Sequence, residues 1–207
     1  EDTDLLYFGN YHIIGSNKRK LLPIHYDNVD SFVALSSGAI WKFCLKKELI
    51  MKYPLPSIRN AEDIAVIPLC ILSAKNIKFS DKALYYYVHN NESLSSSYSS
   101  QVTYNFVKSF DYTLSYLKKP YSPGVEFHGI KTIIYGAVLN GLKASMPWKE
   151  IEGIIINFEK EFPHWSQNKY ISSYSIRKRI FLQLVKLKKY GLLKWYVSIH
   201  NLILRYL

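Results

Sequence analysis

The sequence predicts an α/β fold in which a mixed first half is followed by a helical second half. Strand-like runs of aromatic and β-branched residues occur only up to about residue 95. From about residue 101 onward, apolar residues recur at helical spacing. A hydrophobic content of 48% in 207 residues is enough for a substantial core and excludes general disorder. We therefore expect an α/β unit over residues 1–100 and a helical extension over residues 101–207.

The first elements should form a β-hairpin. Asp4–Ile14 has the composition of a strand, Gly15–Asn17 favours a turn, and Lys18–Ile24 is the candidate partner strand. The next segment, Val29–Ser37, fits a helix or a strand.

Two helices are predicted before residue 75. Trp41–Met51 has a helical pattern, and Tyr53–Pro56 should be a loop, because a residue that precedes proline avoids helical geometry. The second helix covers Ala61–Ala74, with Asn60 as its N-cap. Pro68 lies inside it and should kink it, because proline lacks the N–H of the helical hydrogen bond.

Short strands are expected at Asn76–Phe79 and Ala83–His89, followed by a polar, serine-rich loop over Asn90–Ser100. Everything after this loop should be helical. The predicted helices are Gln101–Lys118, Phe127–Ser145, Trp148–Phe162 and Ile176 to the end. Turns at Tyr121–Gly124 and Met146–Pro147 separate the first three.

The positive charge gathers at the end of the chain. The net charge is +11, and no acidic residue follows Glu161. The nine basic residues after it are Lys169, Arg177, Lys178, Arg179, Lys186, Lys188, Lys189, Lys194 and Arg205. Such a tail implies an anionic partner, either nucleic acid or an acidic membrane surface.

The last helix is apolar over most of its circumference. Its polar residues Lys194, Ser198, Asn201 and Arg205 form one narrow stripe, and His200 is the exception among the apolar remainder. This face must be buried in the protein's own core, in a partner subunit or in a membrane interface. The predicted membrane-binding residues are Arg177, Lys178, Arg179, Lys186, Lys188, Lys189 and Trp195. Nucleic acid is not expected, because the aromatic residues lie with the aliphatic ones.

The remaining composition narrows the class of protein. Cys44 and Cys70 make neither a disulfide framework nor a metal-binding spacing, and they favour a reducing compartment. The apolar run Ile64–Leu72 is much shorter than the ~18 residues that span a bilayer. No signal peptide is evident, and because the chain does not begin with Met, no targeting is inferred from this end.

Two adjacent carboxylates, Glu62 and Asp63, open the helix after Asn60. A helix start alone explains them, because acids in the first turn interact favourably with the helix dipole. The alternative is that one of them does chemistry. The surrounding sequence bears on that choice, with Gly-x-x-Trp-Lys upstream at 38–42 and Tyr-Tyr-Tyr downstream at 85–87.

This order of motifs resembles the second half of the catalytic domain of bacterial family 2 glycosyltransferases. These are GT-A enzymes that build capsules, O-antigens and exopolysaccharides. The resemblance covers about residues 1–100 at motif level, and the helical remainder, including Phe162–Ile171 before the basic run, is similar to the C-terminal extension of these enzymes. It implies a partial GT-A-like α/β domain, the acceptor half, followed by an all-α C-terminal extension.

The resemblance implies that Asp63 is the general base. It would take the proton from an acceptor hydroxyl as that oxygen attacks the anomeric carbon of the donor sugar with inversion. Glu62 would orient the acceptor or the loop. The helix dipole should keep Asp63 ionised, which suits a base at neutral pH.

Three upstream residues would border the acceptor. Trp41 would stack on a sugar ring, or it is a core tryptophan. Lys42 would neutralise a phosphate, or it is a solvated helix residue. Gly38 would allow the acceptor to approach the backbone closely, or it serves a turn.

The loop after the tyrosines would approach the donor diphosphate through His89, Ser93 and Ser95. Here the sequence departs from the family pattern, since Val88 and Asn90 stand where basic residues are common. We expect the tyrosines themselves to be packing residues.

The nucleotide-sugar half of the enzyme and its Asp-x-Asp metal motif are missing from this chain. Asp2-Thr3-Asp4 matches the Asp-x-Asp pattern. It leads directly into the strand that, in the family, lies after the true motif, so we interpret the match as fortuitous. A divalent metal, Mg²⁺ or Mn²⁺, is expected for the parent enzyme, with ligands mostly outside these residues. No metal ligand is assigned in this chain, which alone should be inactive.

The resulting expectation is a fragment of an inverting glycosyltransferase of cell-surface polysaccharide synthesis. It would transfer a sugar from a nucleotide-sugar donor, such as a UDP-sugar, to a glycan or lipid-linked acceptor. It would be cytoplasmic, held at the inner face of the membrane, and able to form a homo-oligomer. The alternative is a non-catalytic basic helical module that binds an anionic membrane surface or a partner protein.

Overall fold

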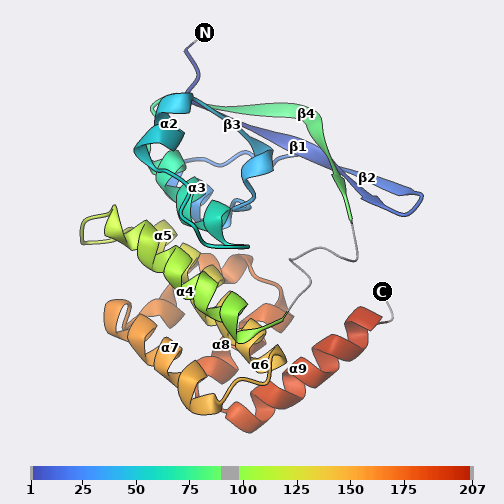
Figure 1. The fold of residues 1–207 in the computed structure, drawn as a ribbon, viewed down its shortest axis with the longest axis vertical. Coiled ribbons are helices and arrows are strands. Elements are labelled where there is room, and N and C mark those ends of the chain that lie inside the picture. Colours follow the sequence, from blue (N-terminus) through green and yellow to red (C-terminus); the bar gives the residue numbers. More distant parts are fainter. Residues whose placement is uncertain (1, 90–97, 206–207) are drawn as a thin grey trace.

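The computed structural model of the protein describes residues 2–89 and 98–205, and over 199–205 it describes the backbone only. It shows an α/β fold with a sheet at one end and a layer of helices at the other (Figure 1). We call residues 2–89 the sheet half and residues 98–205 the helical half.

The sheet is open and mixed, and β1 (Leu5–Ile14) lies at its centre. β4 (Ile77–Val88) runs parallel to β1 along one edge. β2 (Asn17–Leu21) and β3 (Phe43–Leu45) pair antiparallel with the two ends of its other edge. The predicted hairpin is confirmed, with Gly15 in the left-handed conformation at its turn.

The two short strands predicted after residue 75 are one strand. β4 continues through Asp81 and Lys82 because the register against β1 shifts at Gly9. A side chain at Gly9 would meet the carbonyl oxygen of Leu21 at 2.4 Å, so glycine allows the close approach of the hairpin there.

Helices flank the sheet in the first half. α1 (Val29–Leu35) begins at an Asn28 capping box, which settles the helix-or-strand alternative there. The predicted helix over Trp41–Met51 is confirmed only at its two ends. The segment divides into a short 3₁₀ helix η1 (Ile40–Lys42), β3 and α2 (Lys47–Lys52), because Phe43 is buried against Tyr7 when β3 pairs with β1.

α3 (Glu62–Ser73) confirms the predicted central helix, but not its cap. Asn60 adopts a left-handed conformation with φ of 69°, and Ala61 is the N-cap without a side-chain bond. An N-cap residue has extended geometry, so a left-handed Asn60 cannot serve as one. Asparagine is among the few residues that tolerate this conformation.

The helical half contains the predicted helices with shifted boundaries. They are α4 (Ser100–Ser115), α5 (Pro123–Gly129), the π-helix η3 (Ile130–Ala137), α6 (Val138–Lys143), α7 (Trp148–Glu161), the 3₁₀ turns η4 (Trp165–Gln167) and η5 (Lys169–Ser173), α8 (Ile176–Lys186) and α9 (Tyr190–Arg205). The single last helix that was predicted is two, because the chain turns at Lys188, which has φ of 52°. The turn folds α9 back on α8, where Phe181 contacts Tyr196.

α3 lies between the sheet and the helices (Figure 1). Its Ile67 and Ile71 pack with Leu5 and Tyr7 of β1. Within the described residues, no helix is both long and apolar enough to cross a bilayer.

Candidate functional site

The start of α3 and the short helix η1 form the centre of the candidate site. η1 contacts both β1 and α3. A Cβ on Gly38 would lie 3.4 Å from Cγ1 of Ile64, so the loop before η1 lies directly against the first turn of α3. The structure therefore brings together the segments that contain Gly38, Trp41, Glu62 and Asp63.

Asp63 is half-buried in the first turn of α3. Its Oδ1 accepts the backbone N–H of Ile64 at 2.8 Å, and its carboxylate also accepts the N–H of Ile40 in η1. Burial raises the pKa of Asp63, and the nearby Glu62 carboxylate raises it further, while the backbone bonds oppose both. The expectation that the helix start would favour the ionised form is thus outweighed by burial.

In the sheet half, two residues carry buried polar side-chain atoms that have no hydrogen-bond partner within the described part of the chain. One is Glu62, beside Asp63, at its Oε2. The other is Asn10 in β1, at its side-chain amide, and its exposed fraction is zero. Buried polar groups are normally paired, so these atoms are candidates to contact water or a ligand.

Trp41 belongs to a row of aromatic rings on β4 and β1. Its indole stacks on Tyr85 at 4.8 Å and on Tyr87 at 5.0 Å between ring centroids. His12 of β1 stacks on Tyr87 in turn. The indole of Trp41 is half-buried, and two tyrosine rings already stack on it. The Lys42 ammonium lies 5.5 Å from the indole centroid, and burial lowers the pKa of Lys42.

His89 continues the ladder of β4, because its backbone N–H bonds the carbonyl of Ile13 at 2.8 Å. Side chains alternate along a strand, so His89 is placed on the same face as Tyr85 and Tyr87. Its side chain is exposed. The other two residues predicted for the donor side, Ser93 and Ser95, lie outside the described residues.

The helical half supports α3 through Pro68. Proline has no N–H, so the carbonyl of Ile64, four residues earlier, has no helical donor. The buried His128 of α5 donates to that carbonyl. Its Nε2 has no partner among the described residues. Burial lowers the pKa of His128 to about 3, so the imidazole is neutral over the physiological range.

Three further side chains of the helical half bind backbone carbonyls around the site. Thr113 Oγ1 donates to Ala65 in α3 at 2.9 Å. Asn105 Nδ2 donates to Arg59 at 2.8 Å. Lys131 Nζ donates to Ser36 at 3.0 Å, at the end of α1. Burial lowers the pKa of Lys131 to about 8.

None of these four supporting residues was found by sequence reasoning. Each lies more than 40 positions from the carbonyl it binds, and polar residues in helices are common on exposed faces. The one available signal was Pro68, because a proline inside a helix requires a donor from elsewhere for the carbonyl of residue 64.

The Asp2-Thr3-Asp4 sequence, which matches the Asp-x-Asp pattern, has a structural role. Asp4 accepts the backbone N–H groups of Lys75 and Asn76 at 2.8 and 3.0 Å and pairs with Lys46 at 2.7 Å. The bond from Lys46 and those backbone bonds lower the pKa of Asp4 to about 2. Asp2 also pairs with Lys46. The described residues contain no group of acidic, histidine or cysteine side chains that could hold a metal ion, so we derive no chemical step through a metal.

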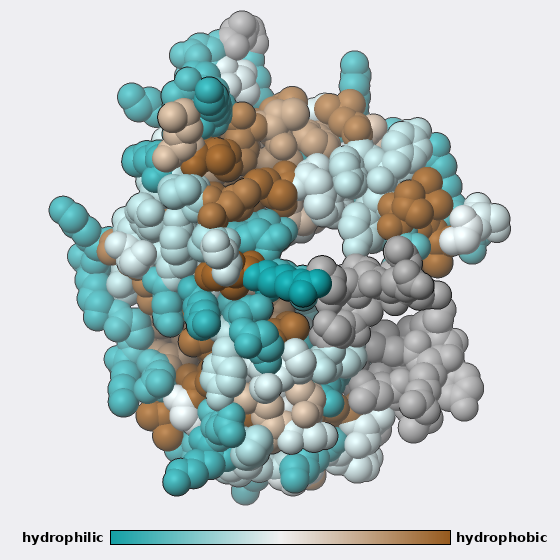
Figure 2. Space-filling view, in the orientation of Figure 1, coloured by the Kyte–Doolittle hydropathy of each residue, from teal (hydrophilic) through white to brown (hydrophobic). Residues whose placement is uncertain are grey.

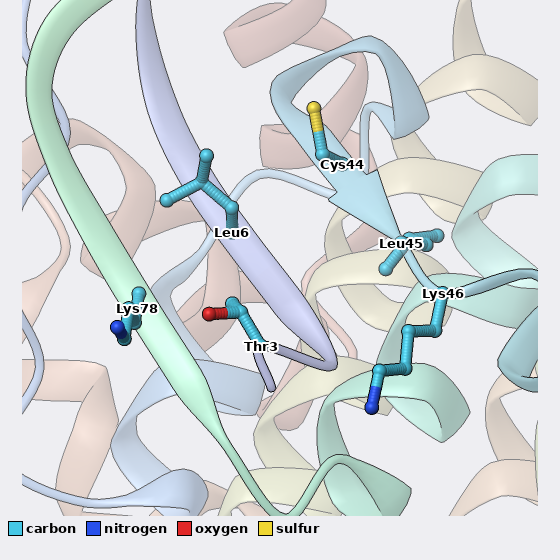
Figure 3. Close-up of a pocket in the computed structure, with 6 residues that line it drawn as sticks. All are labelled: Thr3, Leu6, Cys44, Leu45, Lys46 and Lys78. Atoms are coloured by element: carbon cyan, nitrogen blue, oxygen red, sulfur yellow. The ribbon is translucent and has the colours of Figure 1, made fainter. Parts of the chain in front are cut away.

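A surface pocket of about 450 Å³ lies where β1 and β4 begin and β3 ends (Figure 3). The residues that line it are Thr3, Leu6, Cys44, Leu45, Lys46 and Lys78. It contains none of the predicted site residues, and Lys46 is already paired with Asp2 and Asp4. We therefore assign the candidate site to α3 and η1 instead.

The predicted membrane-binding residues lie on α8, α9 and the turn between them. All of them are exposed except Lys178, whose ammonium lies 4.8 and 4.7 Å from the ring centroids of Tyr135 and Tyr174. Apolar side chains are exposed on the same helices, and Trp195 has an exposed fraction of 67%. The basic–apolar surface is formed by Ile176, Arg177, Arg179, Ile180, Lys186, Leu187, Lys188, Lys189, Leu192 and Trp195.

Comparisons with known proteins give no independent assignment. No family model, no curated protein and no solved structure matches the chain.

Proposed function

We propose that this chain is the acceptor half, with the helical extension, of an inverting glycosyltransferase that uses a nucleotide-sugar donor. The support from the sequence is the order of its motifs, which resembles that of family 2 glycosyltransferases. In space, one observation supports it: segments 20 or more residues apart converge so that Asp63 lies beside η1, which carries Trp41.

In the proposed reaction the acceptor hydroxyl oxygen bonds to the anomeric carbon while the bond to the nucleotide phosphate oxygen breaks. Asp63 takes the hydroxyl proton, and the electron pair of the broken bond leaves on the nucleotide. The backbone N–H groups of Ile40 and Ile64 fix the carboxylate in place. Its raised pKa makes it a stronger base than an exposed aspartate.

The test is sugar transfer by the full-length protein with a panel of nucleotide sugars, followed by mass spectrometry of the products. Asp63→Asn should lower the rate at least about 100-fold, the usual minimum for a general base, while the fold is retained. Asp81→Asn, a change at an exposed aspartate of β4, is the matched control and should leave the rate unchanged. Equal rates for the two variants would exclude Asp63 as the base.

A second function is favoured by the basic–apolar surface. We propose that α8 and α9 dock the protein on an anionic membrane, where a lipid-linked acceptor would be presented. The absence of acidic residues after Glu161 and the exposed Trp195 and Leu192 support this proposal.

Vesicle sedimentation tests it. Deleting residues 177–207 is unsuitable, because Phe181, Leu182 and Leu193 belong to the core. The combined variant Lys186→Gln, Lys188→Gln, Lys189→Gln should instead weaken binding to phosphatidylglycerol-containing vesicles by about 1 kcal/mol per residue. A control that replaces Lys82, Lys149 and Lys160 removes the same charge from other exposed positions and should bind as the wild type does. Equal loss in both variants would contradict docking through α8 and α9.

A further inference from the structure

A polar pocket of about 370 Å³ lies between the loop that leads into α3 and the start of α4. The residues that line it are Ser57, Arg59, Asn60, Ser99, Gln101, Val102, Asn105 and Lys108. In the same view as Figure 1, the surface is hollowed between the sheet half and the helical half, with strongly hydrophilic residues at one margin (Figure 2). Residues of both halves line the pocket, so it lies between the sheet half and the helical half.

The charge of this pocket is entirely positive. Arg59 and Lys108 supply two cationic side chains, and no carboxylate is among the described residues that line it. Neither cation forms an ion pair with another described residue. The pocket also includes the first turn of α4, a helix of 16 residues, whose positive dipole end adds to the field.

The pocket is organised from within by a buried side chain. Asn105 has an exposed fraction of 6%, and it contacts both walls. Its Nδ2 donates to the carbonyl of Arg59 at 2.8 Å, and its Oδ1 accepts from Gln101 Nε2 at 2.9 Å. The backbone at Arg59 is therefore fixed relative to α4 before any ligand arrives, which reduces the part of the entropic cost of binding that comes from ordering this loop.

The pocket is close to the reacting centre. Arg59 precedes Asp63 by four residues, so their Cα atoms are at most about 14 Å apart. A single acceptor molecule can reach both places. An anionic group held at Arg59 and Lys108 would leave a hydroxyl of the same molecule near the Asp63 carboxylate.

We propose that this pocket binds an oxyanion of the acceptor, a phosphate or a carboxylate, and that the acceptor of the proposed transferase is therefore an anionic glycan or glycosyl phosphate. This inference rests on the proposed function for its substrate. Guanidinium and ammonium groups with amide and hydroxyl neighbours suit both oxyanions. The two sources differ in their anion, so binding measurements can separate them.

The test is a titration of the chain, followed by NMR or calorimetry, with three probes. Glucose 1-phosphate and methyl glucuronide carry the two anions, and methyl glucoside is the neutral control. At least one anionic sugar should bind tenfold or more tightly than methyl glucoside, and the preference should shrink at high salt. Arg59→Gln and Lys108→Gln should each weaken that binding about tenfold. Lys160→Gln, at an exposed position of α7, should have no effect.

The two proposals fail in different ways. Equal affinity for charged and neutral sugars, or anion binding that survives Arg59→Gln and Lys108→Gln, overturns the oxyanion pocket without bearing on the role of Asp63. Anion binding that depends on Arg59 and Lys108 supports the pocket even when Asp63→Asn has no effect on transfer. That second result would refute the base assignment alone.

Discussion

At the scale of single residues, Pro68 and His128 act as a pair. Pro68 deprives the carbonyl of Ile64 of its helical donor, and His128 supplies one from the other half of the molecule. The imidazole must be neutral to remain buried there, because an unpaired buried charge is very costly. The first turn of α3, which carries Asp63, therefore depends on the protonation state of a residue 65 positions away.

The pH dependence of stability tests this pair. Burial lowers the pKa of His128 from 6.5 to about 3, so below pH 6.5 the unfolded chain binds a proton that the folded chain does not. Stability is therefore full above pH 6.5 and falls as the pH decreases toward 3. Between pH 7 and pH 5 the free energy of unfolding should fall by about 2 kcal/mol more in the wild type than in His128→Gln.

Urea unfolding at both pH values measures this difference. His164→Gln is the matched control, because His164 is exposed, and it should keep the wild-type pH dependence. If His128→Gln loses as much stability on acidification as the wild type does, the buried neutral imidazole is refuted.

At the scale of elements, α9 divides its apolar residues between two environments. Leu193 is fully buried in the helical core, whereas the adjacent Leu192 has an exposed fraction of 51%. The sequence predicted only that the apolar side of this helix needs burial. The structure shows that the protein itself covers part of it and leaves Leu192 and Trp195 outside.

This division gives a matched pair of variants. Leu193→Ala should lower the free energy of unfolding by 2–5 kcal/mol, because it opens a cavity in a packed core; these are roughly the values for buried leucines elsewhere. Leu192→Ala should change it by less than about 0.5 kcal/mol. Thermal or urea unfolding distinguishes them, and equal effects would mean that α9 does not pack as described.

At the scale of the whole molecule, the two halves share their cores. Ala34 of α1 packs in the helical core, and Val125 of α5 packs with the sheet. Asp30 of α1 accepts the N–H of Gly124 at 2.7 Å and the hydroxyl of Tyr170 at 2.8 Å. The predicted division at residue 100 therefore crosses a continuous set of contacts.

We expect the two halves to unfold together. Native-state hydrogen exchange should give the slowest amides of β1 and of α7 the same free energy of opening, equal to that of global unfolding. Asp30→Ala should lower both values by the same amount. A sheet half that opens at a free energy several kcal/mol below that of the helical half would show two independent units.

Local patterns predicted the hairpin, α3 and the helices after residue 100, because residue type and spacing decide these elements. They failed for β3, since Phe43–Leu45 is a strand only through its pairing with β1. They failed for Asn60, whose left-handed conformation follows from the path of the loop. The raised pKa of Asp63 could not be predicted from the sequence either, because it depends on the burial of the carboxylate beside η1 and Glu62 in the folded chain.

The central claim is that Asp63 is a base whose pKa is raised by burial and by Glu62. A base must be ionised, so the kcat/KM of transfer by the full-length protein should fall as the pH decreases through that raised pKa. Glu62→Gln removes the neighbouring negative charge, and the acid limb of the pH profile should then move to lower pH. The measurement is kcat/KM against pH for the wild type and Glu62→Gln. A shift in that direction supports the account, and an acid limb that stays in place or moves to higher pH contradicts it.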